Sequence, residues 1–493
     1  MSTLARPGDY IEGAFRPSKA ADGEVVVASP ADQSDIVSRF DITLAHAEDA
    51  VGAARAAAPA WARTPIDERR RLLQAYAERC EAHRQAITDA IMREVGKPRW
   101  DASTEAGALA AKVKLMLGEG ATYTADRELD DLPGAIRHRP LGVVAVIGPF
   151  NFPAHLPNGQ IVPALLHGNT VVFKPSEKTP SAAYWMARCF DEAGFPPGVV
   201  NVIIGAADSA RALVASNDID AVLFTGSSAV GKAIIAANAH RPGRLIALEL
   251  GGKNASIVLD DAPLERAVNQ IGFAAFATSG QRCTATSRVY VHRSKIEVLA
   301  AGLSERAKAI AVGHPMDEVF MGPMISEASR GALWSALEKA KAHGFEALVE
   351  ADEPDVRTRG WYVRPSVYRA SSADARVPGY THDELFGPNV ALYPVDSLDE
   401  AIERANDTAY GLAGAVFTRT KERFEEAASR LRVGVCHWNQ STAGASGRLP
   451  FGGVGDSGNH RPAGIYAGRF CAFPQAVRYA PAQDAPLPSW PGW

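Results

Sequence analysis

Ala221-Val-Leu-Phe-Thr-Gly226-Ser-Ser-Ala-Val-Gly231-Lys232 decides the fold, because it joins a short apolar strand to a helix through a glycine turn. Similar strands alternate with helical runs at the spacing of βαβ units, at residues 136–146, 169–173, 199–204, 220–224 and 244–248. This alternation predicts an α/β fold with a parallel, doubly wound sheet. Ligands of such sheets bind at the carboxyl ends of the strands, so the loops there carry the candidate site.

A second α/β region follows from residue 255 to residue 435, with strands expected at 256–259, 288–292, 390–394 and 415–418. We expect an N-terminal hairpin around residues 24–28 and one long helix that starts at Thr64-Pro65 and stops at Gly96. The tail, residues 470–479, reads as a strand that pairs with residues 135–140 or with another subunit. No linker separates the two regions, which predicts two lobes with a cleft between them.

The composition is that of a globular protein that acts on a small molecule. The 493 residues have a net charge of −4 and no basic run, so neither nucleic acid nor a membrane surface is indicated as a partner. Five scattered cysteines do not form a disulfide framework, and the N-terminus has no apolar signal core. We therefore expect a cytoplasmic protein, and we identify no metal site.

Two glycine-rich segments are candidate phosphate sites. Gly226 to Lys232 nearly matches a P-loop, but the loop requires Ser or Thr at the next position and the chain has Ala233. A P-loop nucleotidase therefore stays an alternative of a different class. The turn still offers amides and a helix N-terminus to a pyrophosphate. Residues 453–458 also match a dinucleotide pattern, but they lie between turns rather than between a strand and a helix.

Four polar residues stand where loops can bring them together, although each also has a purely structural interpretation. Cys283 follows an apolar helical run in a short polar loop, and a free cysteine is more often a buried hydrophobe. Glu249 and Asn151 end apolar strands, where they could act as a general base and a fixed amide donor. Glu177, after Lys174, could bind the hydroxyls of an adenosine ribose and so favour NAD over NADP.

The chain resembles the aldehyde dehydrogenase superfamily in seven motifs that occur in the family's order. These are Gly-Pro-Phe-Asn-Phe-Pro (148–153), Lys-Pro-Ser-Glu (174–177), Phe-Thr-Gly-Ser (224–227), Leu-Glu-Leu-Gly-Gly-Lys (248–253), Gly-Gln-Arg-Cys (280–283), Glu-Leu-Phe-Gly-Pro (384–388) and Pro-Phe-Gly-Gly (450–453). The resemblance implies an NAD-binding domain (1–122 and 142–250), a catalytic domain (251–455) and an oligomerisation hairpin with a tail strand (123–141 and 466–485). It also implies a homodimer or a dimer of dimers.

The resemblance assigns roles residue by residue. Cys283 is the nucleophile, Glu249 the base, and Asn151 with the Cys283 amide the oxyanion hole. The cofactor NAD is expected at Lys174, Ser176, Glu177, Gly205, Gly226, Ser227, Gly231, Glu384 and Phe386. Further motifs, at 137–140, 155–159 and 458–462, resemble a branch whose aldehyde carries carboxylates, which makes Arg282, His460 and Arg461 candidate substrate-binding cations. The chain departs from the pattern of that branch at Lys253 and at residues 440–444, which leaves open which anionic aldehyde the protein accepts.

Overall fold

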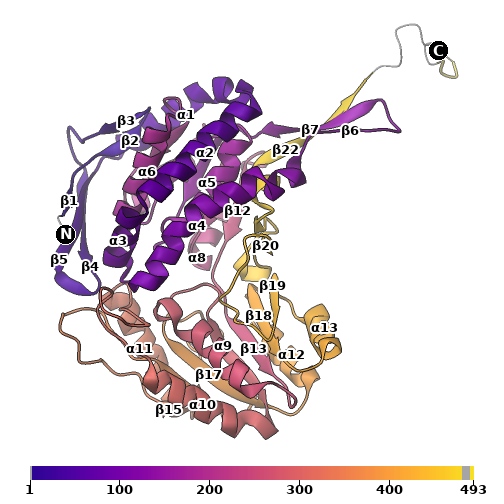
Figure 1. The fold of residues 1–493 in the computed structure, drawn as a ribbon. Coiled ribbons are helices and arrows are strands. Elements are labelled where there is room, and N and C mark those ends of the chain that lie inside the picture. The colour runs from indigo at the N-terminus through magenta and orange to yellow at the C-terminus, as the bar shows by residue number, and fades with distance from the viewer. Residues whose placement is uncertain (1–2, 480–488, 493) are drawn as a thin grey trace.

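A computed structural model describes residues 3–479 and 489–492 as two α/β lobes with a projecting arm (Figure 1). The first sheet has the strand order β12, β11, β8, β9, β10, β2, β3. The bounds of its strands are Leu245–Glu249 (β12), Ala221–Thr225 (β11), Val143–Ile147 (β8), Thr170–Lys174 (β9), Val200–Val202 (β10), Asp9–Ile11 (β2) and Ala14–Arg16 (β3). The five strands from β12 to β10 are parallel, which confirms the predicted fold class.

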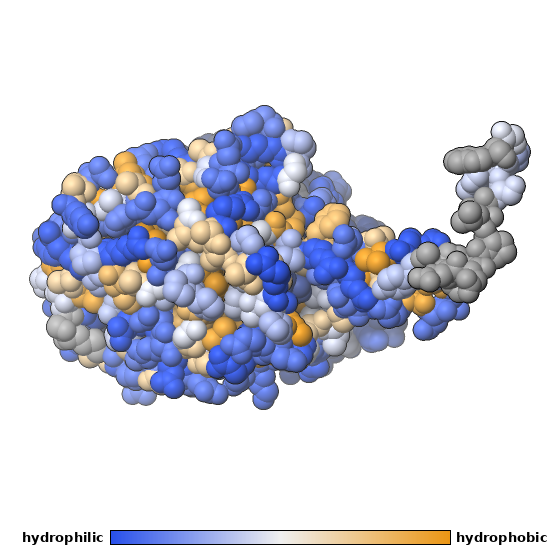
Figure 2. Space-filling view, turned by 90° about the horizontal axis from the view of Figure 1, so that it is seen from above, coloured by the Kyte–Doolittle hydropathy of each residue, from blue (hydrophilic) through white to orange (hydrophobic). Residues whose placement is uncertain are grey.

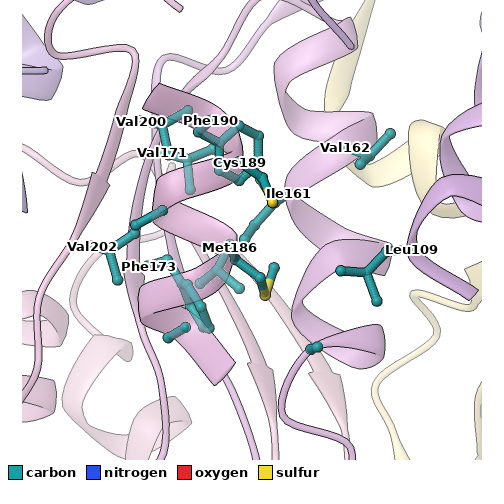
Figure 3. Packing of buried hydrophobic residues seen from close by; sticks show 14 of the residues in the cluster. Leu109, Ile161, Val162, Val171, Phe173, Met186, Cys189, Phe190, Val200 and Val202 are labelled. Atoms are coloured by element: carbon teal, nitrogen blue, oxygen red, sulfur yellow. The ribbon is translucent and has the colours of Figure 1, made fainter. Parts of the chain in front are cut away.

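Helices cover both faces of this sheet because its central strands are mostly apolar, and β8 is apolar at every position. In β8, Val144 and Val146 face one hydrophobic cluster, while Val143, Ala145 and Ile147 face another. The first cluster lies under α2 (Ile66–Ala82), α3 (Arg84–Val95), α4 (Arg99–Leu117), α5 (His155–Leu166) and α6 (Pro180–Ala193). The second lies under α1 (Ala45–Arg63), α7 (Ala207–Ala215) and α8 (Ser228–Asn238). Figure 3 shows Phe190 of α6 close to Val171, and Met186 of the same helix closer to Phe173.

The second sheet has the order β15, β16, β17, β14, β13, β18, β19. The bounds of its strands are Glu346–Val349 (β15), Ser366–Arg369 (β16), Asn389–Val395 (β17), Thr286–His292 (β14), Asn254–Val258 (β13), Ala413–Phe417 (β18) and Val435–Trp438 (β19). Only the β15–β16 pair is antiparallel. One face is covered by α9 (Leu264–Phe276) and α10 (Ile296–Ala309), and the other by α11 (Glu327–Ala342), α12 (Leu398–Asn406) and α13 (Lys421–Arg430).

The two sheets meet end to end. The last strand of the first sheet, β12, finishes at Glu249, and β13 of the second sheet starts at Asn254. Only four residues join them, so the carboxyl ends of the first sheet's parallel strands face the amino ends of the second sheet's strands. The junction lies beside β8, where the strand order of the first sheet reverses, which is the usual ligand position in such sheets.

The predicted N-terminal hairpin is confirmed: β4 (Gly23–Ser29) and β5 (Asp32–Ile42) pair antiparallel, with β1 (Leu4–Ala5) beside them. Two other predictions were wrong. The single helix expected from Thr64 to Gly96 is two helices that break at His83, and Thr64 makes no capping bond to α2. The single strand expected at 136–146 is β7 (Gly134–Pro140) followed by β8, which belong to different sheets. Gly142, at φ 129°, makes the turn between them.

The arm consists of β7 between β6 (Arg127–Glu128) and the tail strand β22 (Ala472–Arg478). Seven residue pairs join β22 to β7, from Ala472–Pro140 to Arg478–Gly134, so the tail strand pairs within its own chain, as one of the two predictions had it. The arm extends away from both lobes in Figure 1, and in the view of Figure 2 it projects from one side of the body. Residues 480–485 of the predicted tail lie outside the described residues. Over 3–479 and 489–492, no helix combines the length and apolarity needed to cross a membrane.

Candidate active site

A strained turn after α9 places Cys283 at the junction of the two sheets. Thr278 and Ser279 have φ of 56° and 55°, and Gly280 has φ 68°. Left-handed backbone at a residue with a side chain costs about 1–3 kcal/mol, so neighbouring contacts must hold it. The Thr278 hydroxyl donates to Asp101 Oδ2 at 2.5 Å, and the Ser279 hydroxyl donates to the Gly322 carbonyl at 2.8 Å.

Asn254 fixes the other side of the Cys283 loop, a role that the sequence interpretation missed. Its Nδ2 donates to the carbonyls of Cys283 (2.8 Å) and Ala285 (2.9 Å), and its Oδ1 accepts from the Ala413 amide. The side chain is buried, so these three bonds satisfy both its donor and its acceptor. A polar residue directly after Leu-Glu-Leu-Gly-Gly-Lys is the only signal that the sequence offered for it.

The Glu249 carboxylate lies at the end of β12, buried and close to Cys283. Neither of its oxygens has a hydrogen-bond partner among the described residues, although the Ala463 amide lies nearby and opposes part of the pKa shift. Burial raises the pKa of Glu249 well above its usual value. Burial, followed by the charges of Glu384 and Glu249, raises the pKa of the Cys283 thiol to about 12. The thiol is therefore protonated at neutral pH.

Asn151 approaches the Cys283 loop from the first lobe. Its buried Nδ2 donates to the Gln281 carbonyl at 2.9 Å, two residues before the thiol. An amide nitrogen has two hydrogens, so the second remains for a ligand oxygen. The structure thus brings Cys283, Glu249 and Asn151 into one site, while their individual catalytic roles stay predictions.

The three candidate substrate cations have different surroundings. The Arg282 guanidinium is mostly buried and pairs with Asp101 at 3.0 Å, and it lies over the rings of Phe152 and Phe273. His460 and Arg461 are exposed, and Arg461 donates to the His460 carbonyl. Arg282 is therefore already neutralised inside the protein. Substrate binding by any of the three stays a prediction.

The residues expected at the cofactor lie along the carboxyl edge of the first sheet. Lys174 ends β9, is buried, and has Glu177 at 3.8 Å. Glu177 is exposed, Ser176 accepts a bond from the Lys178 amide, and Gly205 is buried just before α7. The Gly226 amide donates to the Glu249 carbonyl, which links the glycine turn to the end of β12.

The start of α8 fits a dinucleotide. Ser227 caps the helix, and the buried Ser228 hydroxyl has no hydrogen-bond partner among the described residues. A side chain at Gly231 would lie 2.7 Å from Leu250, so glycine lets α8 approach the strand loop closely. The amides of a helix N-terminus and the orphaned Ser228 hydroxyl together suit a pyrophosphate. Lys232, which a P-loop would direct at phosphates, instead pairs with Asp456 at 2.6 Å.

Glu384 and Phe386 belong to a loop of the second lobe that closes over this edge. Glu384 Oε1 accepts from the Gly252 amide at 2.9 Å, and burial raises the pKa of Glu384 to about 7. Phe386, at φ 51°, makes an edge contact with Phe150 of the first lobe. The loop therefore contacts both the segment after Glu249 and the segment before Asn151. Among the described residues no cluster of histidine, cysteine and acidic side chains could hold a metal ion.

Comparisons with known proteins agree with this geometry. The model of the aldehyde dehydrogenase family matches residues 15–477. The chain is 39% identical over 466 residues to an N-succinylglutamate 5-semialdehyde dehydrogenase of Novosphingobium aromaticivorans, covering 92% of this chain and 96% of the relative.

Solved structures show the same likeness. Lactaldehyde dehydrogenase from Escherichia coli has 30% identity and a TM-score of 0.90, with 97% of this chain and 99% of the other covered. A mutant of aldehyde dehydrogenase C from Pseudomonas syringae, in complex with NAD+ and octanal, has 30% identity and a TM-score of 0.91, with 98% and 99% covered. The chain therefore belongs to the aldehyde dehydrogenase family and is an aldehyde-oxidising enzyme.

Proposed function

We propose that this enzyme oxidises N-succinyl-L-glutamate 5-semialdehyde to N-succinyl-L-glutamate with NAD, a step of bacterial arginine breakdown by the succinyl route. The observation that carries the proposal is the 39% identity over 92% of the chain to a relative of that name. The joint position of Cys283, Glu249 and Asn151 supports the chemistry.

The proposed reaction begins when the Cys283 thiol loses its proton to solvent and the thiolate attacks the aldehyde carbon, which gives a thiohemiacetal oxyanion. The Asn151 amide and the Cys283 backbone amide would stabilise the oxyanion that forms. Loss of hydride from the thiohemiacetal leaves a thioester on Cys283. Glu249 then takes a proton from water, which attacks the thioester and releases the acid. A carboxylate with a raised pKa and no hydrogen-bond partner among the described residues suits this task.

NAD bound along the carboxyl edge of the first sheet would supply the hydride acceptor. Lys174 and the amino end of α8 would hold its phosphates, and Glu177 its adenosine ribose hydroxyls. Glu384 and Phe386 would hold the part of NAD that consists of nicotinamide and its ribose. The exposed carboxylate of Glu177 would repel a 2′-phosphate, which favours NAD over NADP.

A panel of aldehydes tests the substrate. We expect kcat/KM for N-succinylglutamate semialdehyde to exceed that for succinate semialdehyde, glutamate semialdehyde and short alkanals. Succinate or glutamate semialdehyde as the best substrate would replace the proposed one within the same class. A preference for alkanals would overturn the anionic substrate altogether.

The projecting arm supports an oligomer. A three-stranded sheet that leaves the body with Phe473 61% exposed has edges and apolar surface suited to another subunit. We expect a homodimer or a dimer of dimers in the cytoplasm. Light scattering of the purified protein measures the mass, and a monomer at micromolar concentration would contradict the expectation.

A further inference from the structure

The buried face of α4 carries three charged side chains, and two of them have an opposite charge nearby among the described residues, whereas the third does not. Asp101 pairs with Arg282, and Glu105 pairs with Lys97 at 2.7 Å. Lys112, two turns beyond Glu105, is 6% exposed and donates to the Gly464 carbonyl at 2.6 Å. Within the described part of the chain, no carboxylate lies at ion-pair distance from Lys112. A buried ammonium with only a carbonyl acceptor is costly unless an anion completes its surroundings.

His155 supplies a second unsatisfied group beside Lys112. It is the first residue of α5, and its buried Nδ1 has no hydrogen-bond partner among the described residues. Burial, followed by the charges of Lys112 and Lys97, lowers the pKa of His155 to about 4. The ring is therefore neutral and lies within the field of both ammonium groups. A neutral imidazole still has one N–H to donate.

Gly159 brings α5 close to Lys112. It lies one turn after His155, on the same side of α5, and a side-chain carbon at this position would be 3.9 Å from Lys112 Cε. The two helices pack against each other and run side by side in Figure 1. Because Gly159 has no side chain, nothing from this position on α5 covers the Lys112 stem.

Both groups adjoin the reaction site. His155 follows Asn151 by four residues, and its amide donates to Glu105 Oε1. Gly464, the acceptor of Lys112, follows Ala463, the residue whose amide lies near the Glu249 carboxylate. Consecutive Cα atoms are about 3.8 Å apart, so Lys112 reaches the segment that borders the base.

We propose that Lys112 and His155 form the subsite that binds a carboxylate of the aldehyde substrate. The inference rests on the proposed anionic substrate class and names the residues that recognise it. A substrate carboxylate there accepts a charge-assisted bond from the Lys112 ammonium and a second bond from the His155 ring. Neutral aldehydes leave the ammonium without a counter-charge and are bound less tightly. Arg282 cannot serve equally, because Asp101 already neutralises it.

Lys112→Met tests the subsite with Lys114→Met as the matched control, since Lys114 is exposed on the same helix. We expect Lys112→Met to lower kcat/KM for N-succinylglutamate semialdehyde by about 10- to 100-fold, mainly through KM, because charged hydrogen bonds contribute about 1.5–3 kcal/mol. Oxidation of octanal should stay the same or improve. Lys112→Arg should recover part of the loss, and Lys114→Met should resemble the wild type for both aldehydes.

The outcomes separate this inference from the proposed function. A wild-type preference for octanal over all anionic aldehydes overturns the substrate class and the subsite together. A different result would overturn the subsite alone. In that case the wild type prefers an anionic aldehyde, but Lys112→Met lowers kcat/KM for that aldehyde and for octanal equally, or lowers neither. If succinate semialdehyde is the best substrate and Lys112→Met removes that preference, the subsite holds and the proposed substrate falls. Thermal unfolding verifies that each variant is folded, and Lys112→Gln replaces the methionine variant if that one is not.

Discussion

Asp101 and Glu105 lie one helical turn apart on α4, and each holds a different loop of the reaction site. Asp101 binds the Thr278 hydroxyl and the Arg282 guanidinium of the loop that carries Cys283. Glu105 Oε1 accepts from the amides of Ala154 and His155, which follow the Asn151 turn. The spacing of two carboxylates on one rigid helix therefore helps to set the position of Cys283 relative to Asn151.

Asp101→Asn should slow formation of the thioester and destabilise the fold. It leaves the Arg282 guanidinium without its counter-charge and frees a strained turn, so we expect a loss of about 100-fold in the first turnover, the typical effect of a small misplacement. Stopped-flow measurement of the first turnover and thermal unfolding verify it. Asp208→Asn, which removes an exposed partner of Arg211, should change neither quantity. Wild-type rates in Asp101→Asn would contradict the positioning role.

Asn151→Ala should lower kcat by about 100- to 1000-fold, the usual effect of removing one oxyanion donor. The amide also bonds the Gln281 carbonyl, so Asn151→Asp provides a variant of equal size that lacks the donor. Steady-state kinetics should show similar losses in both variants, and NAD affinity by fluorescence titration should stay unchanged. A kcat within about threefold of the wild type would remove Asn151 from the oxyanion hole.

Alkylation of Cys283 in the cofactor-free enzyme should accelerate steadily with pH. Burial and the charges of Glu384 and Glu249 raise the thiol pKa to about 12, so the reactive thiolate is scarce below that pH. Its fraction, and the iodoacetamide rate, should rise about tenfold for each pH unit through about pH 10. Mass spectrometry of the Cys283 peptide follows the reaction, with free cysteine as reference. A plateau near about pH 8 would show that the thiol is activated without cofactor.

Glu177→Ser should relax the preference for NAD. Glu177 follows Lys174 by three residues, and its side chain is exposed. Its carboxylate would face the 2′ position of the adenosine ribose. We expect the ratio of kcat/KM with NADP to that with NAD to rise about fivefold, because removing one like charge at close range gains about 1 kcal/mol. Lys178→Ser, at the neighbouring position, serves as control. An unchanged ratio would place the ribose elsewhere.

The sequence was sufficient for the elements that depend on local pattern. The apolar runs around Val171 and Leu223 indicated buried parallel strands, and the loops after them contain the residues that meet at the junction. The division of residues 134–147 between two sheets was not predictable, because an apolar run does not show which neighbours its strand will have. The break between α2 and α3 at His83 was also not predictable, because no proline or glycine lies there.

Long-range partners limited the site predictions more severely. Arg282 looked like a free cation beside the nucleophile, but its partner Asp101 lies 181 residues earlier in the chain. Lys112 is one of two lysines in α4, and only the packing of α4 on α5 shows that it lacks a counter-charge among the described residues. Cys283, Glu249 and Asn151 could be proposed because motifs mark their loops, whereas Asn254 is recognised only from its bonds to the Cys283 loop.

The most direct test of the account uses Glu249→Gln, mixed with NAD and N-succinylglutamate semialdehyde and quenched in acid. Without the base, the thioester should form but hydrolyse slowly. We expect about one equivalent of reduced cofactor per subunit in a burst, and an N-succinylglutamyl adduct on Cys283 in the mass spectrum. Continued turnover at the wild-type rate, or an enzyme with no adduct on Cys283, would contradict the proposed mechanism.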